Sequence, residues 1–397
     1  MVWKTEALGD IAVMTSGGTP SKKHPEYYEN GTIPWVRSGE LENGAIRDTE
    51  LKITQAGLDN SSAKIFPKGT LLIALYGATI GKLAYLDIEA CTNQAVCGIF
   101  ENKKVSLQYL YYFLLFHRPD LVKQGIGGAQ PNISQTILKK LMVSYPVDKA
   151  EQLRIVARIE ELFSQLDNGV ETLQKTKRQL AVYRQAVLKE AFDRIISDSK
   201  MQAIKSVCND IKVGIVIKPA QYYTDETNGI KAFRSANVRE FRINDTDWVY
   251  LTKEGHRSNL RSEIHTGDVL IVRSGYPGTA CVVSEEYNNC NAVDILIAVP
   301  NTDIVTSEYL CAFTNSPYGR KLVAEKKRGV AQAHLNVGGY SKMEIPVPEI
   351  SVQKQVVRSI EQRLSVYNGI SKTIDTALRQ AEAMRQSILK QAFEGGI

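Results

Sequence analysis

The stretch PVDKAEQLRIVARIEELF at residues 146–163 returns at residues 346–364 as PVPEISVQKQVVRSIEQRL. The segment YRQAVLKEAF at residues 183–192 returns in the same way as MRQSILKQAF at residues 384–393. From Gln152 onward, one offset of 201 positions relates both pairs, so Gln152 aligns with Gln353. The chain therefore contains one long segment twice, and each copy follows a different stretch of sequence.

Apolar residues lie seven positions apart along both copies, which is the heptad spacing of a coiled coil. They are Ile159, Leu166, Leu173, Leu180 and Val187 in the first copy, and Ile360, Tyr367, Ile374, Ala381 and Ile388 in the second. An apolar seam of this length predicts two long helices that pack against each other. Asp148 and Glu151 form a capping-box pattern at the first helix, and Ser351 is the expected cap of the second.

The order of the segments predicts the architecture. A globular segment precedes each helix, so helices that pack on each other must run antiparallel. We expect an α+β fold in which two similar globular α/β domains with twisted, barrel-like sheets are separated by an antiparallel coiled coil, forming a pseudo-two-fold dumbbell. The expected domains are residues 1–147, the helical region 148–197, residues 198–350 and the helical region 351–397.

The two globular segments also resemble each other in short islands. Apolar runs such as residues 69–75 and 268–272 predict buried strands in both. The matched islands are residues 33–38 with 230–235, 66–73 with 264–271, 76–81 with 274–278, and 128–133 with 330–335. Between these islands the segments differ widely, which suggests one scaffold that recognises two different targets.

Composition narrows the class of protein. The 397 residues carry a net charge of +6, which neither identifies nor excludes a nucleic-acid binder. No apolar run approaches the roughly 20 residues of a membrane span, and the N-terminus lacks the apolar region of a signal peptide. The six cysteines include no C-x-x-C pair and indicate thiols in a reducing cytosol. We expect a cytoplasmic protein with no membrane partner.

A search for catalytic motifs finds none that is complete. Residues 77–83 resemble a phosphate-binding loop, but the loop is one residue short and has Leu83 where Ser or Thr would hold Mg²⁺. Residues 125–128 lack the strand–turn–helix context of a dinucleotide site, and the histidines show no metal-ligand spacing. We expect no catalytic residue and no metal site on this chain.

The remaining candidates form a recognition surface. Ser16, Gly17, Gly18 and Thr19, followed by Lys22 and Lys23, could contact phosphate oxygens, or could form a solvated hairpin loop. Arg37 and Arg234 follow matched strands, and each could read a guanine or close a salt bridge. Further candidates for DNA contact on loops and turns are Tyr76, Lys82, Gln130, Asn132, Arg273, Tyr276, Gln332, His334 and Asn336. Lys327 and Arg328 precede the second loop and could clamp the DNA backbone, or could lie on a solvated helix face.

The whole chain resembles the specificity subunit of type I restriction–modification systems. The resemblance is carried by Gln-x-x-Ile/Val-Val…Ile-Glu from Gln152 and Gln353, and by Arg-Gln-x-Val/Ile-Leu-Lys-x-Ala-Phe ending at Phe192 and Phe393. The first globular segment adds Thr-Ser-Gly-Gly-Thr-Pro-Ser and Leu-Tyr-Gly-Ala-Thr-Ile-Gly-Lys. The second segment departs from this pattern, because it has no clear Gly-Gly-Thr-Pro loop.

The resemblance implies that each globular domain reads one half of a split, asymmetric site in double-stranded DNA. The helices would set the spacing and dock two methyltransferase subunits, which would bring S-adenosylmethionine and methylate adenine after base flipping. Restriction would need further motor-nuclease subunits that use ATP and Mg²⁺. The chain itself would bind no cofactor and catalyse nothing.

Two other hypotheses remain open at the level of sequence. One is a stand-alone bipartite DNA-binding adaptor or regulator without a methyltransferase partner, which co-purification would distinguish. The other is an enzyme with an unrecognised site, which activity of the isolated chain would support.

Overall fold

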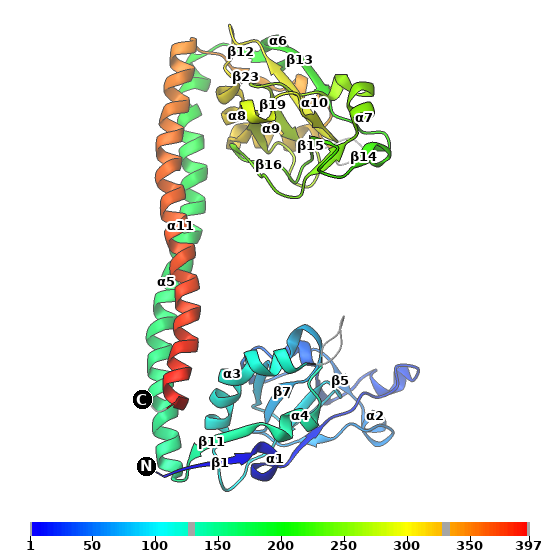
Figure 1. Ribbon diagram of the computed structural model, residues 1–397, viewed down its shortest axis with the longest axis vertical. Helices are drawn as coiled ribbons and strands as arrows, with labels where there is room; N and C mark the ends of the chain where they lie inside the picture. The colour runs from blue at the N-terminus through cyan, green and yellow to red at the C-terminus, as the bar shows by residue number, and fades with distance from the viewer. Residues whose placement is uncertain (1, 126–131, 328–333, 395–397) are drawn as a thin grey trace. The chain divides into compact units, whose positions relative to one another are not determined.

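The chain divides into two compact units. The computed structural model describes residues 2–125, 132–327 and 334–394. Unit 1 contains residues 1–172 and 376–397, and unit 2 contains residues 173–375. Each unit holds a β-rich part, which we call head 1 (residues 2–147) or head 2 (residues 199–349), and sections of the long helices α5 and α11 (Figure 1).

Head 1 is built from short strands. A five-stranded sheet has the order β2-β10-β7-β8-β4, a four-stranded sheet has the order β5-β3-β9-β6, and β1 pairs with β11. The strands are β1 Trp3–Ala7, β2 Met14–Ser16, β3 Ile33–Val36, β4 Gly44–Ile46, β5 Lys52–Ile53, β6 Ile65–Phe66, β7 Leu71–Ala74, β8 Leu83–Leu86, β9 Ala90–Thr92, β10 Val96–Ile99 and β11 Met142–Pro146. Strands β7 and β10 are buried along their whole length.

The helices of head 1 are α1 Leu8–Ile11, α2 Gln55–Asp59, α3 Leu107–Gln124 and α4 Gln135–Lys140, with 3-10 turns η1 Pro25–Tyr27, η2 Ser38–Glu40 and η3 Gly77–Thr79. Helix α3 begins after Ser106, whose hydroxyl accepts a hydrogen bond from the backbone N–H of Tyr109. This is the usual N-cap arrangement, and it fixes the first turn of α3.

Head 2 repeats the design with changes. Its sheets have the orders β13-β22-β19-β20, β14-β18-β15-β21, β12-β23 and β16-β17. The strands are β12 Met201–Ala203, β13 Cys208–Val213, β14 Tyr223–Thr224, β15 Ile230–Phe233, β16 Val238–Arg239, β17 Arg242–Ile243, β18 Val249–Leu251, β19 Val269–Val272, β20 Ala280–Val282, β21 Asn291–Ala292, β22 Ile295–Pro300 and β23 Glu344–Pro346. The main sheets of both heads are open and twisted rather than closed barrels.

The helices of head 2 are α6 Ile204–Val207, α7 Lys253–Ser258, α8 Ser307–Asn315, α9 Pro317–Lys327 and α10 Val337–Ser341, with η4 Pro219–Tyr222, η5 Leu260–Ser262 and η6 Glu285–Tyr287. Helix α8 corresponds to α3. The Thr306 hydroxyl accepts a hydrogen bond from the N–H of Tyr309, as the Ser106 hydroxyl does from the N–H of Tyr109. None of the helices within the described ranges is long and apolar enough to cross a bilayer.

The two long helices are continuous. Helix α5 spans Lys149–Asp198 and helix α11 spans Ile350–Glu394, and neither is interrupted at Gly169 or Gly369. Asp148 caps α5, with its carboxylate accepting from the N–H of Ala150 at 2.9 Å. The expectation that Ser351 caps α11 is wrong. The helix begins one residue earlier, and the carbonyl of Glu349 accepts its first hydrogen bonds.

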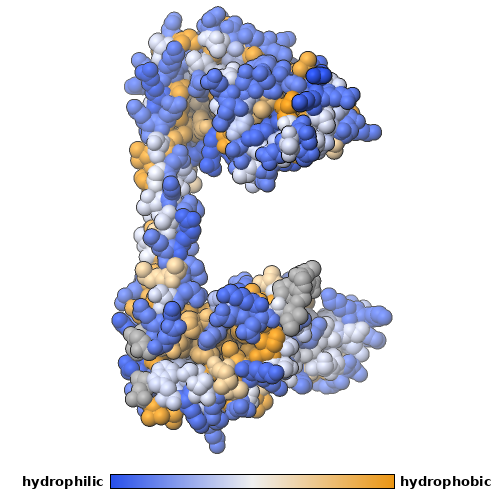
Figure 2. Space-filling model, in the orientation of Figure 1, coloured by the Kyte–Doolittle hydropathy of each residue, from blue (hydrophilic) through white to orange (hydrophobic). Residues whose placement is uncertain are grey.

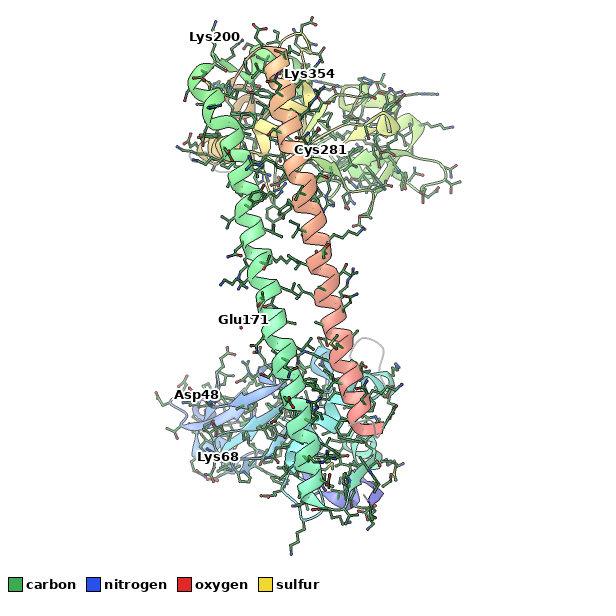
Figure 3. The ribbon with its side chains drawn as sticks, turned by 90° about the vertical axis from the view of Figure 1, so that its left-hand side faces the viewer. Asp48, Lys68, Glu171, Lys200, Cys281 and Lys354 are labelled. Carbon is green, nitrogen blue, oxygen red and sulfur yellow. The ribbon has the colours of Figure 1, made fainter. Side chains whose placement is uncertain are left out.

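Within each unit the two helices lie side by side and run antiparallel (Figure 3). In unit 2, Lys177 pairs with Asp375 at 2.6 Å, whereas Glu190, further along α5, pairs with Arg363, which comes earlier in α11. In unit 1, Arg385 pairs with Asp167. The heptad positions predicted as the seam are all buried or half-buried: Ile159, Leu166, Leu173, Leu180, Val187, Ile360, Tyr367, Ile374, Ala381 and Ile388.

The core of each head includes residues of both long helices. Phe393, near the end of α11, packs its ring against Tyr109 and Phe113 of head 1 at 5.3 and 5.4 Å. Phe192 of α5 packs against Tyr309 and Phe313 of head 2, both at 5.4 Å. The core of head 1 also contains Ile388, Leu389 and Ala392 from α11. Neither head therefore completes its core without both helices.

Candidate nucleic-acid interface

Several strand ends of head 1 meet at one edge. Strand β10 begins at Val96, opposite Ala74 at the end of β7, and its Cys97 lies opposite Ser16 at the end of β2. The segments beyond these ends are residues 17–24, 75–82 and 93–95. The segment 93–95 lies next to both of the others, because Thr19 bonds to Gln94 and the N–H of Leu75 donates to the carbonyl of Ala95. We call these segments, together with Asn132, edge 1.

The glycine-rich loop of edge 1 is fixed by its backbone. The N–H of Gly18 donates to the carbonyl of Thr92 at 2.9 Å, and the carbonyl of Gly18 accepts from the indole of Trp35 at 3.0 Å. A Cβ atom on Gly17 would lie 2.0 Å from the Thr92 oxygen, so only glycine fits. Both glycines are buried, and they position the residues that follow.

Polar side chains at edge 1 and at the adjoining end of β2 bond to partners that the sequence analysis missed. The hydroxyl of Ser16 accepts from Gln135 at 2.7 Å, and Thr19 donates to the exposed Gln94. Asn132 is exposed and forms an isolated β-bridge with Tyr76, whose side chain is 41% exposed. Gln94 could have been suspected, because the polar triplet Thr-Asn-Gln directly precedes a buried strand.

The candidate cations of head 1 differ in their availability. Lys22 and Lys23 are exposed beyond the glycine-rich loop, and Lys82 is half-buried just before β8. Arg37 is engaged in ion pairs with Glu40 at 3.3 Å and with Glu50. For Arg37 the structure therefore shows the salt bridge that the sequence left as one of two alternatives.

Head 2 has the same edge, although its sequence hides it. The N–H of Gly214 donates to Ile295 O, and the N–H of Ile215 donates to Ala292 O, each at 2.9 Å. These bonds match those of Gly17 and Gly18 in head 1. Residues 214–218 are thus the counterpart of the glycine-rich loop and were absent from the sequence-based candidates. The offset of 197 that relates Ile33 to Ile230 also relates Gly17 to Gly214.

The remaining segments of this second edge are residues 273–278, 292–294 and 334–336, and with 214–218 we call them edge 2. The N–H of Leu335 donates to Arg273 O at 3.1 Å, as Ile133 donates to Leu75 O in head 1. The Ser274 hydroxyl and the Nδ1 atom of His334 are 2.5 Å apart. Tyr276 is 84% exposed, the largest exposed fraction among the large apolar and aromatic side chains described.

Three sequence-based candidates of head 2 have structural partners. The guanidinium of Arg273 pairs with Asp294 at 2.6 Å and donates to Leu335 O. Asn336 caps α10 by accepting from the N–H of Gly339 at 2.7 Å. Arg234 donates to the carbonyl of Asp247 at 2.5 Å, while its buried Nε atom has no hydrogen-bond partner among the described residues. Gln130, Arg328, Gln332 and the side chain of Lys327 lie outside the described part of the structure.

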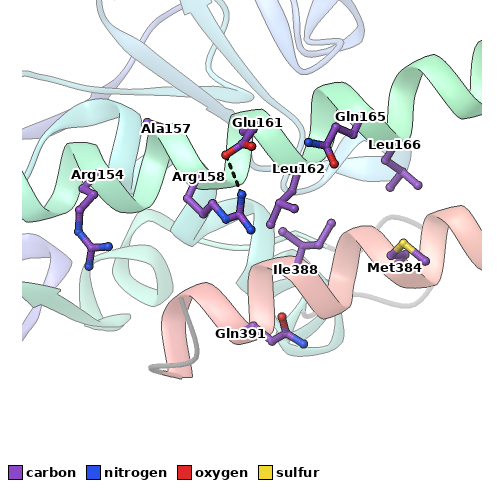
Figure 4. Close-up of a pocket in the computed structure, with 10 residues that line it drawn as sticks. All are labelled: Arg154, Ala157, Arg158, Glu161, Leu162, Gln165, Leu166, Met384, Ile388 and Gln391. Atoms are coloured by element: carbon purple, nitrogen blue, oxygen red, sulfur yellow. Dashed lines mark hydrogen bonds and ion pairs between the residues drawn. The ribbon is translucent and has the colours of Figure 1, made fainter.

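The helix pair of unit 1 provides a second surface. A groove of about 870 Å³ lies between α5 and α11, with Leu162, Leu166, Met384 and Ile388 among its apolar lining (Figure 4). Its rim includes Arg158, which pairs with Glu161 at 2.7 Å.

The matching positions in unit 2, at the same offset of 201, have different chemistry. Arg363 and Tyr183 replace Leu162 and Met384, and the Arg363 guanidinium lies 5.7 Å from the centre of the Tyr183 ring. Within the described residues, no group of three or more His, Cys, Asp or Glu side chains could hold a metal ion.

Comparison with known proteins supports one family. Residues 2–180 match the family model of the type I restriction modification DNA specificity domain. The EcoKI specificity subunit of Escherichia coli (strain K12) is 23% identical over 99% of this chain and 89% of its own length. The StySPI specificity subunit of Salmonella potsdam is 22% identical over the same shares, and the MjaIX specificity subunit of Methanocaldococcus jannaschii is 32% identical over 44% of this chain and 40% of its own.

Solved structures show the same fold. A chain from a structural study of complex assembly and conformational transition of the type I R-M system superposes with a TM-score of 0.80 and 18% identity, covering 100% of this chain and 98% of that chain. The HsdS subunit from Thermoanaerobacter tengcongensis gives a TM-score of 0.54 at 18% identity, covering 100% and 97%. Residues 2–180 therefore match the type I restriction modification DNA specificity domain, and over nearly its whole length the chain is similar to type I restriction–modification specificity subunits and shares their fold.

Proposed function

We propose that edge 1 and edge 2 each read one half of a split, asymmetric DNA sequence. A specificity subunit is the non-catalytic component of its complex that recognises DNA, so the reading surface must lie on this chain. The observation that carries the proposal is the pair of matched backbone bonds at Gly17–Gly18 and Gly214–Ile215. The same backbone arrangement occurs in both heads, and it presents different side chains in each. The relatives do not favour the stand-alone adaptor.

The exposed groups of the two edges suit the two kinds of DNA contact. Lys22 and Lys23 of edge 1, and Lys218 of edge 2, are exposed cations that can bind phosphates. Thr19 with Gln94, and Asn132, present hydroxyl and amide groups that can bond base edges. Arg37 and Arg273 contribute less to binding, because carboxylates of the same head already neutralise them.

The paired helices would dock methyltransferase subunits. We propose one subunit for each end of the helix pair, because the helical sequence is repeated, and the groove of unit 1 is a surface for such contact. These subunits would bring S-adenosylmethionine, and restriction subunits would use ATP and Mg²⁺. Residues 1–147 and 198–350 would be the target recognition domains, and 148–197 and 351–397 the helical regions, of a cytoplasmic complex.

The proposal is tested by co-expressing the chain with its methyltransferase subunit in a host that lacks both. The genome should then carry methylated adenine at a sequence of two defined halves with an unspecified spacer, and omission of either protein should abolish it. The purified chain alone should show no methyltransferase, nuclease or ATPase turnover. Methylation at one continuous sequence would contradict the division between the two edges.

A matched pair of variants assigns the role of edge 1. Gln94→Ala removes an exposed amide that no buried group requires, so the protein should fold normally. It should relax the methylated sequence in one half only, because a base contact supplies discrimination of about 1–3 kcal/mol. Gln174→Ala, on the exposed face of α5, should leave the sequence unchanged.

A further inference from the structure

Edge 2 carries an aliphatic tip of two exposed residues, Val216 and Ile217, where edge 1 carries Thr19 and Pro20. Val216 is 49% exposed and Ile217 is 78% exposed, and they follow Ile215, which is 7% exposed. The visible surface of head 2 is mostly hydrophilic, with only scattered apolar residues (Figure 2). Two adjacent exposed aliphatic side chains on a loop therefore need an explanation, because their exposure to water is unfavourable.

The tip is held from both sides. On one side, a Cβ atom on Gly214 would lie 2.3 Å from Ala292 O, and Ile215 forms a β-bridge with Val293. On the other side, Lys218 adopts a left-handed conformation with φ of 44° immediately before Pro219 and the turn η4. The backbone thus presents Val216 and Ile217 outward from a fixed base, which a recognition contact requires.

We infer that Ile217, supported by Val216, contacts the 5-methyl group of a thymine in the major groove of the half-site that head 2 reads. This inference rests on the proposed function of edge 2. The thymine methyl is the apolar group on the base edges of the major groove, so an exposed aliphatic side chain reads thymine there. Lys218, the next residue, is exposed; it contacts the adjacent phosphate and fixes the depth of the tip.

The corresponding loop of edge 1 has a different chemistry, so we expect head 1 to respond differently to loss of a thymine methyl group. By the offset of 197, Thr19, which is hydrogen-bonded to Gln94, stands at the place of Val216, and the buried Pro20 stands at the place of Ile217. A polar pair of this kind bonds to donors and acceptors of the bases rather than to a methyl group. Head 1 should therefore be much less sensitive to loss of a thymine methyl than head 2.

The experiment uses the full chain assembled with its methyltransferase subunit, and synthetic duplexes carrying the methylated sequence found in cells. Each thymine is replaced in turn by deoxyuridine, which pairs identically but lacks the methyl group. At one position of the head 2 half-site, binding by the unchanged protein should weaken about fourfold, the effect expected for one methyl group losing apolar contact. Ile217→Ala should weaken binding to the thymine duplex by a similar factor and make the two duplexes equivalent.

Two controls isolate the contact. Ile217→Val should keep part of the preference for thymine, and Val182→Ala, which removes an exposed aliphatic group on α5, should keep all of it. The inference is overturned if Ile217→Ala retains the full preference for thymine, or if no deoxyuridine in that half-site weakens binding. Either result leaves the proposed function standing, whereas absence of any split methylated sequence would remove the proposed function itself.

Discussion

Gln152 and Gln353 make the same three hydrogen bonds in the two units. Gln152 accepts from Ser106 N at 2.8 Å and donates to the carbonyls of Lys104 and Pro146 at 2.9 and 2.8 Å. Gln353 repeats this with Thr306 N, Ile304 O and Pro348 O at 2.9, 2.8 and 2.9 Å. Both side chains are fully buried. Each glutamine therefore joins the first turn of a long helix to the start of α3 or α8.

Replacing either glutamine by alanine should destabilise its unit. The substitution leaves one N–H and two carbonyls without their partner in a buried place, which costs about 2–4 kcal/mol in total. Urea unfolding of Gln152→Ala and Gln353→Ala should show losses of similar size. Gln362→Ala, on the exposed face of α11, is the control and should change the free energy of unfolding by less than about 0.5 kcal/mol.

The glycines inside the long helices should be replaceable with a gain in stability. Gly169 and Gly369 lie in continuous helix, and a Cβ atom at either position would have no atom within 4 Å. Alanine restricts the unfolded chain more than glycine, so each change should raise the free energy of unfolding by about 0.5–1 kcal/mol. Denaturant unfolding measures this. A loss of stability would show that the helices bend at these residues.

Leu173→Asp should loosen the middle of the helix pair while both heads stay folded. Leu173 is half-buried on the seam, and it belongs to neither of the clusters that join the helices to the heads. A charge there should cost at least about 2 kcal/mol. Affinity for the full split site should then fall toward that of one head, because the second contact depends on a fixed geometry. Gln174→Ala is the matched control, and unchanged split-site affinity and assembly in Leu173→Asp would refute the coiled-coil seam.

The acid stability of head 1 should depend on Glu6. Hydrogen bonds from Tyr145, Lys104 and Lys4 lower the pKa of this carboxyl from 4.5 to about 2. A depressed pKa stabilises the fold above the ordinary value, and this contribution is lost as the pH falls from about 4.5 toward 2. Urea unfolding of Glu6→Gln across this range should show the largest deficit at neutral pH, shrinking with acidity. A deficit that is independent of pH would contradict this origin.

The long helices could be predicted from the sequence, because heptad spacing is a local pattern. The predicted start of α5 at Asp148 and of α11 at Ser351 are each within one residue of the observed starts at Lys149 and Ile350. Their antiparallel pairing followed from the order of segments. The cap of α11 was misplaced because Ser351 has the better capping side chain, whereas the backbone geometry favours Glu349.

The edges were harder to predict, because they depend on contacts between distant residues. The ion pairs that neutralise Arg37 and Arg273 use Glu50 and Asp294, which no sequence spacing singles out. The loop at Gly214 shares one glycine and a set of backbone bonds with the loop at Gly17, and backbone bonds leave little trace in side-chain identity. The sequence therefore located the first edge and missed part of the second.

Exchange of one head tests the central claim most directly. Residues 199–349 lie between the end of α5 and the start of α11, so they can be replaced by the corresponding segment of another specificity subunit while both helices stay intact. Phe192 of α5 and Ile360 of α11 would be kept, because they complete the core of head 2. The adenine-methylated sequence of the host genome is then read for the original and the exchanged protein.

The account predicts that one half of the methylated sequence changes and that the other half, with the spacer length, stays the same. Changes in both halves, or no change in a protein that assembles and methylates normally, would contradict the claim that each head reads its own half-site.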